Sequence, residues 1–195
     1  IDAAAEIRVV SSDAALVYGG PFEDAKLNIG DYTGFTNIGG QFPIGEVFTE
    51  PRALESCNGA VRIFAFGGAD FIVAFPETPF LLEIAGGLIT GAPGAPAAFH
   101  DMLTAIRAEE GVARVRELGF GLNRALTRER RVRDVGTYER MCGVHLSLGA
   151  KHAVYPKAGF SKKTGRFHID VFADARAVEI DGARVFDGVC YSPTA

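Results

Sequence analysis

The segment Ala60–Ile89, AVRIFAFGGADFIVAFPETPFLLEIAGGLI, indicates the fold class of this chain. It contains three apolar runs rich in Phe, Ile and Val, namely Ala60–Phe66, Phe71–Phe75 and Phe80–Ile89. Glycine or proline turns separate these runs. Apolar runs that recur about every ten residues between turn signals are typical of strands in an antiparallel sheet.

Short apolar segments on both sides of this region predict further strands. They are Glu6–Ser11, Ala14–Tyr18, Lys26–Ile29, Phe35–Ile38, Val112–Leu118, Val144–Leu148, Phe167–Phe172, Ala177–Ile180 and Ala183–Phe186. Asp181-Gly182 is typical of the two-residue turn of a hairpin, here between the last two segments. The residues from Pro43 to Pro51 are expected to form an ordered loop or an edge segment of the sheet.

The periodicity changes in Ala97–Glu110, where apolar residues recur at helical spacing at Phe99, Met102, Leu103 and Ile106. Gly111 then ends the predicted helix. The arginine-rich segment Leu126–Arg140 is expected to be a loop that runs into a short helix. Its arginines are compatible with a solvated loop or with a basic rim that attracts acidic peptides. The pattern as a whole predicts an α+β fold, mostly antiparallel sheet with one or two helices.

The chain has 195 residues, and 48% of them are hydrophobic. We expect a single domain over residues 1–195, because domains commonly have roughly 100–150 residues. The net charge of −4 argues against nucleic-acid binding through a positive surface. The longest apolar stretches, such as Ala14–Tyr18, are far shorter than the roughly 20 residues that a transmembrane helix needs, so no membrane insertion is expected.

Three cysteines, Cys57, Cys142 and Cys190, stand at wide spacing. Their number and spacing match neither a disulfide framework nor a metal knuckle, which favours reduced thiols. The opening residues IDAAAEIRVV have no basic or apolar region typical of a secretion signal. These features lead us to expect a cytoplasmic protein.

His168-Ile169-Asp170 is a candidate metal-binding pair. In a strand, residues i and i+2 point to the same face, so His168 and Asp170 would present an imidazole and a carboxylate side by side. A pair of this kind is also compatible with an ordinary surface or core contact. His145 alternates with the apolar residues of Val144–Leu148, and it is compatible with a ligand or with a hydrogen-bonded core residue.

Two glutamates stand in apolar surroundings, Glu46 after the uncharged residues 32–45, and Glu117 within VRELGFGLN. Burying an unpaired carboxylate costs several kcal/mol, so each needs a cation or strong donors unless it is exposed at an edge. Arg116 is next to Glu117, but it points to the opposite face of a strand and is a poor partner.

Together these residues form a set of oxygen and nitrogen donors without a thiolate: Glu46, Glu117, His145, His168 and Asp170. Such a set suits Zn²⁺, Mn²⁺, Co²⁺ or Fe²⁺. If one carboxylate bridges, five side chains can hold two ions about 3.5–4 Å apart, as in hydrolytic two-metal sites.

Four blocks of the sequence carry a family resemblance: residues 37–51 (NIGGQFPIGEVFTEP), 117–123 (ELGFGLN), 144–149 (VHLSLG) and 168–170 (HID). In these blocks, and in their order, the chain resembles the thermophilic-type metalloaminopeptidases (aminopeptidase T and S, leucyl aminopeptidase type). Residues 179–182 (EIDG) are also similar to the end of the family's sequences. The resemblance covers most of the chain from about Tyr32 to Phe186, and it corresponds to the family's C-terminal, metal-carrying part.

The resemblance implies a fold like the catalytic domain of aminopeptidase T and S. It also implies a two-metal site with Glu46, Glu117, His145, His168 and Asp170 as ligands, where the ions activate water and bind the free N-terminus of a peptide. The 2,5-dihydroxypyridine dioxygenases share this fold, and in them a histidine and the HxD pair hold one Fe²⁺.

The chain departs from the family in two ways. Family peptidases have a catalytic tyrosine seven residues after the histidine of the third block, and His152 stands at that position here. We expect His152 or Tyr155 in the catalytic role, by donating a hydrogen bond; His152 is also compatible with a further ligand or a loop residue. The family's N-terminal α/β domain is absent from this sequence, so we expect an open site that can hold a longer peptide.

These features predict an aminopeptidase-like domain that binds a peptide or peptide-like substrate at one or two divalent ions. Its activity is open between three alternatives: an active metal-dependent aminopeptidase, a non-catalytic peptide-binding protein, and a ring-cleaving dioxygenase with Fe²⁺. Because members of the family often form dimers, a homodimer is also expected.

Overall fold

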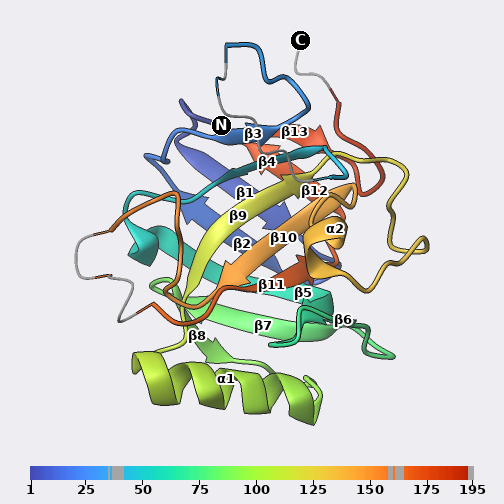
Figure 1. Ribbon diagram of the computed structural model, residues 1–195. Coiled ribbons are helices and arrows are strands. Elements are labelled where there is room, and N and C mark those ends of the chain that lie inside the picture. The colour runs from blue at the N-terminus through green and yellow to red at the C-terminus, as the bar shows by residue number, and fades with distance from the viewer. Residues whose placement is uncertain (35, 37–41, 158–159, 161–164, 193–195) are drawn as a thin grey trace.

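The computed structural model describes residues 1–34, 36, 42–157, 160 and 165–192. The strands are β1 (Glu6–Val10), β2 (Ala15–Gly19), β3 (Lys26–Asn28), β4 (Glu46–Thr49), β5 (Cys57–Gly67), β6 (Val73–Ala74), β7 (Phe80–Ala85), β8 (Leu88–Gly91), β9 (Val115–Gly121), β10 (Gly143–Leu148), β11 (Ile169–Ala173), β12 (Ala177–Ile180) and β13 (Ala183–Phe186). The helices are α1 (Ala97–Glu110), α2 (Val135–Tyr138) and the single 3-10 turn η1 (Leu54–Ser56). The fold is α+β, as the sequence predicted (Figure 1).

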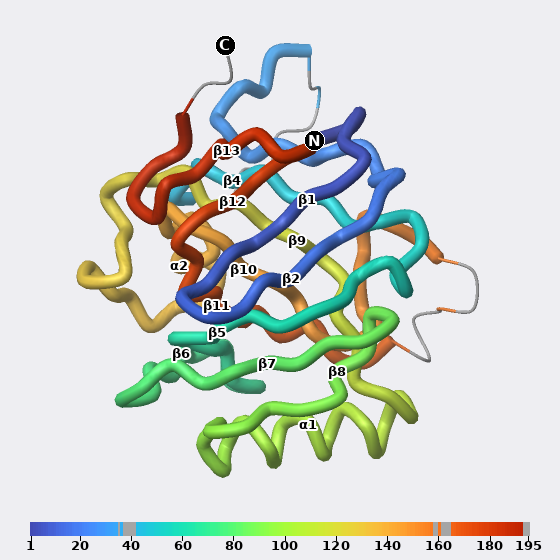
Figure 2. The backbone as a smooth tube through the Cα atoms, turned by 180° about the vertical axis from the view of Figure 1, so that it is seen from behind, coloured from blue at the N-terminus to red at the C-terminus, as the bar shows by residue number. Residues whose placement is uncertain are grey.

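The strands form one antiparallel sheet in the order β13-β12-β1-β2-β5-β11-β10-β9-β4-β3. The short strands β6 and β7 also pair with β5, and β8 pairs with β7. The sheet curls into a half-barrel, so that β1, β2 and β12 lie on the far side from β9 and β10 (Figure 2). Segments far apart in the sequence are therefore neighbours, and β11 lies directly between β5 and β10.

The main core fills the inside of this curl. Strand β10 shows how the sequence builds it, since Val144, Leu146 and Leu148 alternate toward the core while His145 and Ser147 point to the other face. The core continues through Ile7 of β1, Leu16 of β2, Val61 and Ile63 of β5, and Leu118 of β9. Because every second residue of β9, β10 and β11 is committed to this core, the remaining residues share the opposite face.

Helix α1 runs along one edge of the molecule, beside β7 and β8 (Figure 1). Its bounds confirm the predicted helix, and Phe99, Leu103 and Ile106 are buried on the sheet side. Gly111 ends it in a left-handed conformation with φ of 80°, and its N–H donates to the carbonyl oxygen of Arg107.

Helix α2 covers the face of the sheet that points away from the main core, near β10 (Figure 1). Asp134 caps it by accepting a hydrogen bond from the Thr137 N–H. Beneath it lies a second apolar cluster, made of Phe64, Ala65, Val73, Val135, Tyr138, Met141 and Phe172. This short helix lies at the end of the arginine-rich segment Leu126–Arg140, as predicted, and it holds the chain before β10 against the sheet.

Several predicted strands differ from those observed. The residues Phe80–Ile89 form two strands rather than one, because Gly86 and Gly87 adopt positive φ and turn the chain into the β7–β8 hairpin. In Phe71–Phe75 only Val73 and Ala74 form a strand, β6, while Ile72 makes an isolated bridge to Asp134. The segment Pro43–Pro51 is not only a loop or an edge, because it contains β4, which lies inside the sheet between β3 and β9.

Other predictions about the strands have different outcomes. Of the predicted strand Phe35–Ile38 only Thr36 is described, and part of the first resemblance block also lies outside the described residues. Asp181 and Gly182, with φ of 49° and 81°, form the predicted two-residue turn between β12 and β13. Among the described residues, no helix has the length and apolar character needed to cross a membrane.

Candidate metal centre

The polar faces of three neighbouring strands meet at one place. Strand β10 pairs with β9 on one side and with β11 on the other, so that His145 lies opposite both Gly119 and Phe172. Ser147 lies opposite Asp170, and its hydroxyl oxygen accepts a hydrogen bond from the Glu117 N–H at 3.0 Å. The register of the sheet therefore brings Glu117, His145 and Asp170 onto one buried surface.

Glycine at position 119 makes room for one of these side chains. A Cβ atom on Gly119 would lie 2.0 Å from Nε2 of His145, far inside any real contact distance. The imidazole of His145 thus occupies the space that a side chain at 119 would fill. The pattern ELGFGLN thus contains a glutamate that faces the site and, two positions later, a glycine whose missing side chain makes room for His145.

The five predicted metal ligands form two overlapping groups. One group is Glu46, Glu117 and His145, and the other is Glu117, His168 and Asp170; the donor atoms within each group lie within 4.8 Å of one another. Glu117 belongs to both groups, as a bridging carboxylate would. The structure thus brings together all five residues that the sequence singled out, from β4, β9, β10, β11 and the residue before β11.

The group around Glu46 is already neutralised by protein side chains. Nη2 of the buried Arg140 lies 3.0 Å from Oε2 of Glu46, and Nε2 of His145 lies 3.3 Å from its other oxygen. His145 also lies 3.4 Å from Oε1 of Glu117. This side of the site holds an internal cation in the form of a guanidinium group.

The group around Asp170 has fewer hydrogen-bond partners. Asp170 is only 3% exposed, and its Oδ1 atom accepts no hydrogen bond from the described residues. The nearest cationic atom is Nε2 of His168 at 3.3 Å. A buried carboxylate oxygen without a donor is costly, and a bound cation relieves that cost.

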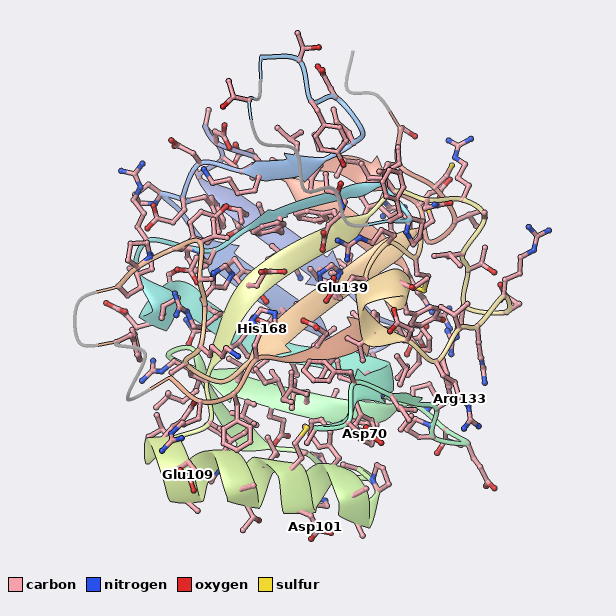
Figure 3. All side chains as sticks on the ribbon, viewed as in Figure 1. Asp70, Asp101, Glu109, Arg133, Glu139 and His168 are labelled. Atoms are coloured by element: carbon pink, nitrogen blue, oxygen red, sulfur yellow. The ribbon has the colours of Figure 1, made fainter. Side chains whose placement is uncertain are left out.

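Glu139 is a member of the site that the sequence did not reveal. It follows α2, accepts a hydrogen bond from Arg140 and interacts with Asp170. Burial, and then the negative charge of Asp170, raise the pKa of Glu139 to about 9. A protonated Glu139 can accept a hydrogen bond from Arg140 through one oxygen and donate its proton to Asp170 through the other. The raised pKa of Glu139 is therefore compatible with its contact to the guanidinium. Figure 3 shows Glu139 and His168 on the same side of the sheet.

The hydrogen bonds of His168 leave one ring nitrogen available. Its Nδ1 atom lies 3.0 Å from the carbonyl oxygen of Lys151, which can only accept, so Nδ1 carries a proton. In the neutral ring the lone pair then resides on Nε2, the atom that faces Asp170. A backbone carbonyl behind the ring is the usual way to orient a metal-binding histidine.

His152 has the opposite arrangement. The backbone N–H groups of Val154 and Tyr155 both point at its Nδ1 atom from 3.3 Å, so Nδ1 accepts. In the neutral ring the proton therefore sits on Nε2, which lies 2.7 Å from Oε2 of Glu117. His152 is thus arranged as a hydrogen-bond donor toward the site.

Tyr155, the second predicted catalytic residue, points elsewhere. Its buried hydroxyl lies 2.8 Å from the carbonyl oxygen of Asp24 and 3.1 Å from that of Phe48. These contacts tie the segment after His152 to the strand that carries Glu46. This position gives Tyr155 a role in holding the two sides of the site together.

Electrostatic coupling shifts the pKa values of the ligand candidates. For Glu117 and Asp170, burial alone would raise the pKa, but the histidines beside them outweigh it and lower the pKa of both. For His145 and His168, burial opposes protonation, but the carboxylates outweigh it and raise both pKa values, that of His168 to about 9. The histidines therefore supply positive charge to the carboxylates, a charge that a metal ion can replace.

A cavity of about 540 Å³ opens onto the Asp170 side of the site. Its floor includes Glu117, Glu139, His152, His168 and Asp170, and its walls include the aromatic or apolar residues Phe48, Phe71, Val135 and Val154. Glu46, His145 and Arg140 do not line it. Only one of the two overlapping groups is therefore accessible to a ligand from this cavity.

Comparison with known proteins gives structural matches alone, because no family model and no curated protein matches the sequence. The chain is similar to the structure of 2,5-dihydroxypyridine dioxygenase from Pseudomonas putida KT2440, with a TM-score of 0.71, 19% identity, and coverage of 99% of this chain and 56% of that one. It is also similar to the aminopeptidase AmpT from Thermus thermophilus, with a TM-score of 0.62, 15% identity, and coverage of 96% and 50%.

The chain has the fold that these two proteins share. This agrees with the resemblance seen in the sequence. The chain spans about half the length of each structure, 56% and 50%. At identities of 19% and 15% the similarity concerns the fold, and the chemistry has to be argued from the residues above.

Proposed function

We propose that this chain binds one divalent metal ion through Glu117, His168 and Asp170, and that the ion and the surrounding carboxylates hold the amino-terminal end of a peptide. The observation that carries the proposal is the Oδ1 atom of Asp170, which is buried, accepts no hydrogen bond from the described residues, and lies at the floor of a cavity. The donor set of one imidazole and two carboxylates suits Zn²⁺, Mn²⁺ or Co²⁺.

A single ion is favoured over two because of Arg140. Its guanidinium pairs with Glu46 inside the protein. A second cation between Glu46 and His145 would have to displace this contact or tolerate a neighbouring positive charge. The accessible group, by contrast, faces the cavity, and Oδ1 of Asp170 accepts no hydrogen bond from the described residues.

The floor of the cavity supports a ligand that carries a free amine. Three carboxyl groups lie there, those of Glu117, Glu139 and Asp170. When Glu139 keeps its proton, one divalent ion would balance the charges of Glu117 and Asp170, so the loaded floor carries little net charge. The lone pair of an uncharged amino terminus can then bind the ion, while the apolar walls suit the first side chain of the peptide.

Other residues of the site orient the metal ligands and provide a hydrogen-bond donor. His168 is oriented by Lys151, and Glu117 is held by His152, so the geometry of the site is fixed before a ligand arrives. The Nε2 proton of His152 can be shared with an oxygen that develops negative charge beside Glu117. When bound, a divalent ion polarises a carbonyl and lowers the pKa of a water molecule, so peptide hydrolysis is within the chemistry of such a site.

Calorimetry with a metal-loaded protein tests the proposal. A short peptide with a free amino terminus should bind at least about tenfold more tightly than the same peptide with an acetylated terminus, since acetylation removes the nitrogen lone pair that would bind the ion. A chelator should abolish the difference. Equal binding of both peptides, or binding that is insensitive to the chelator, contradicts the proposal. Release of p-nitroaniline from Leu-p-nitroanilide with added Co²⁺ then separates hydrolysis from binding alone.

A second candidate is ring cleavage with Fe²⁺, the reaction class of the dioxygenase that shares the fold. Only the group of Glu117, His168 and Asp170 is accessible from the cavity, and this favours the dioxygenase candidate. A site with one metal ion and few protein ligands keeps coordination positions open for a substrate and O₂. Incubation of the Fe²⁺-loaded protein with 2,5-dihydroxypyridine in air should consume O₂ if this candidate is correct. Peptide binding without O₂ consumption favours the first proposal.

A further inference from the structure

A second cavity adjoins the one at the metal centre. It has a volume of about 550 Å³ and lies between α1 and the segment Gly68–Phe75. Its walls are mostly apolar and include Phe66, Ile72, Phe75 and Met102. On the helix side, Ala98, Met102 and Ala105 share one face, since they are spaced by four and three residues.

The two cavities share part of their lining. Gly68, Ala69, Phe167 and Ile169 line both of them. Gly68 and Ala69 bring no large side chain of their own to the boundary, and Oδ1 of Asp70 lies close beside Gly68, 2.5 Å from where a Cβ atom of that glycine would be. A ligand that leaves the metal centre in this direction enters the groove against α1.

The turn beside this boundary is rigidly built. The Gly68 N–H donates to the Ile72 carbonyl oxygen at 2.9 Å, and the Phe71 N–H donates to the Gly68 carbonyl oxygen at 3.1 Å. The Phe71 carbonyl in turn accepts from the Val135 N–H of α2 at 3.2 Å. Through these bonds the turn is fixed between the two cavities.

Phe71 at the tip of this turn is unusual in two respects. Its φ of 60° is an uncommon conformation for a bulky residue, and its side chain is 72% exposed at the first cavity. Ile72, which lines the second cavity, is also largely exposed. Two neighbouring apolar side chains therefore face the two cavities, one each, and both are free to cover apolar ligand groups.

Charged residues of both signs line this path. The first cavity has Lys151 and Arg166 in its lining besides its three carboxyl groups, and Asp70 and the exposed Arg133 line the second cavity. Arg133 forms no ion pair with any residue that the structure describes. A carboxylate or acidic side chain of a peptide, at some distance from its amino terminus, would complement Arg133.

We propose that the ligand of this site is a peptide long enough to occupy both cavities, with its amino terminus at the metal centre and an apolar side chain in the groove against α1. This inference rests on the proposed function and names the class of its ligand. A single amino acid or a pyridine ring needs only the first cavity, since cavities of a few hundred Å³ already enclose a small molecule. The second cavity is explained by a longer chain.

The experiment compares peptides by calorimetry on the Mn²⁺-loaded protein. One peptide is pentaglycine, and the others carry a single leucine at each of positions two to five. The groove predicts that leucine at one of positions three to five raises the affinity about tenfold over pentaglycine, as expected for partial burial of its side chain. Where a peptide is cleaved, the same comparison is made with KM.

Two tryptophan variants on α1 locate the effect. Ala105→Trp fills the groove and should abolish the gain from leucine, while the affinity for pentaglycine and for Mn²⁺ stays within twofold of the unmodified protein. Thr104→Trp places the same side chain on the exposed, opposite face of the helix and should retain the gain.

The outcomes separate this inference from the proposed function. If pentaglycine binds in a metal-dependent way but leucine at positions three to five adds nothing, or Ala105→Trp keeps the gain, the groove is not part of the site and the proposed function survives. If no peptide binds to the metal-loaded protein, the proposed function fails and the inference fails with it.

Discussion

Nε2 of His152 lies 2.7 Å from Oε2 of Glu117, and two backbone N–H groups point at the other nitrogen of the same ring. This combination distinguishes His152 from His168, whose Nδ1 donates to a carbonyl oxygen and whose Nε2 has the lone pair when the ring is neutral. One histidine is therefore prepared to donate a proton, and the other to bind a cation. The division of roles follows from backbone contacts rather than from the residue type.

Replacing His152 by glutamine tests this division. The affinity for Zn²⁺ should change by less than about tenfold. Altering a residue that contacts a metal ligand, but not the ion, typically lowers metal affinity by about 10–100-fold, so this change lies at or below the lower end of that range. Peptide binding or turnover should fall more than metal affinity does, because the donor beside Glu117 is lost. Zinc titration by calorimetry gives the first quantity. A loss of metal affinity as large as that caused by His168→Gln would make His152 a ligand.

Arg140 should be essential to the stability of the site. Its buried guanidinium contacts Glu46 and Glu139, and Arg140→Met leaves Glu46 with His145 as its cationic neighbour among the described residues. Breaking a buried ion pair by removing one partner costs about 3–5 kcal/mol. Urea denaturation should show a loss of this size.

Two companion variants sharpen that test. Arg130→Met alters an exposed arginine of the preceding segment and should change the free energy of unfolding by no more than about 0.5 kcal/mol. The double variant Glu46→Gln with Arg140→Met should recover part of the loss, because it removes both charges. Equal stabilities of Arg140→Met and the unmodified protein would show that the pair contributes nothing.

The metal-free protein should lose stability as the pH rises from about 6.5 to 9. The pKa of His168 is raised in the folded state to about 9, so its contribution is complete below the unfolded pKa of 6.5 and is lost as the pH rises through 9. Glu139, whose pKa is also raised to about 9, loses its proton over the same upper range and acts in the same direction.

His168→Gln should therefore flatten this pH dependence. The expected change in the free energy of unfolding between pH 6 and pH 9 is about 1–3 kcal/mol smaller than in the unmodified protein. Urea denaturation in the presence of a chelator measures it, with His100→Gln, an exposed histidine of α1, as the matched control. An identical slope in both variants would contradict the coupling of His168 to Asp170.

Gly119→Ala tests the packing around His145. The added Cβ would lie 2.0 Å from Nε2 of that ring, so the imidazole must move away from Glu46 and Glu117. Overpacking of this kind costs about 1–3 kcal/mol. Thermal denaturation should show the loss, and metal affinity should fall with it if the position of His145 supports Glu117. Unchanged stability would mean that the ring has room to shift freely.

Much of the fold follows from local sequence patterns. Ala97–Glu110 is helical over its predicted length, because its apolar spacing and the following glycine agree. The hairpin at Asp181-Gly182 likewise follows from turn chemistry. The β7–β8 hairpin was predicted as one strand, although Gly86-Gly87 carried the signal for a two-residue turn, because the apolar residues on either side hid it.

The sequence indicated the five metal-ligand candidates of the site but not their neighbours Glu139 and Arg140. Glu46, Glu117, His145, His168 and Asp170 stood out because their neighbours are apolar, and the structure brings them together. Glu139 stood beside an arginine in a charged segment, where a glutamate is usually solvated. Only the tertiary packing of α2 against the sheet buries it, and no local pattern reports that. Arg140 was counted among the loop arginines for the same reason.

The opposite orientation of Arg116 and Glu117 was predicted correctly from strand alternation. Arg116 is fully buried on the other side of β9, where its guanidinium makes two hydrogen bonds to the carboxylate of Glu50, at 2.9 and 2.8 Å. The partner itself could not be named from the sequence, because Glu50 and Arg116 are 66 positions apart. Pairings of this kind depend on the strand order, which local patterns do not determine.

The most direct test of the central claim is the affinity for Zn²⁺ of the purified chain and of Asp170→Asn, measured by calorimetry against a competing chelator. The account predicts one ion per chain, with an affinity that falls at least about 100-fold in Asp170→Asn, beyond what residues around the ligands typically contribute. Asp101→Asn, an exposed aspartate on α1, should bind like the unmodified protein. If the chain binds no zinc, or if Asp170→Asn binds it as tightly as Asp101→Asn does, there is no metal centre at Asp170.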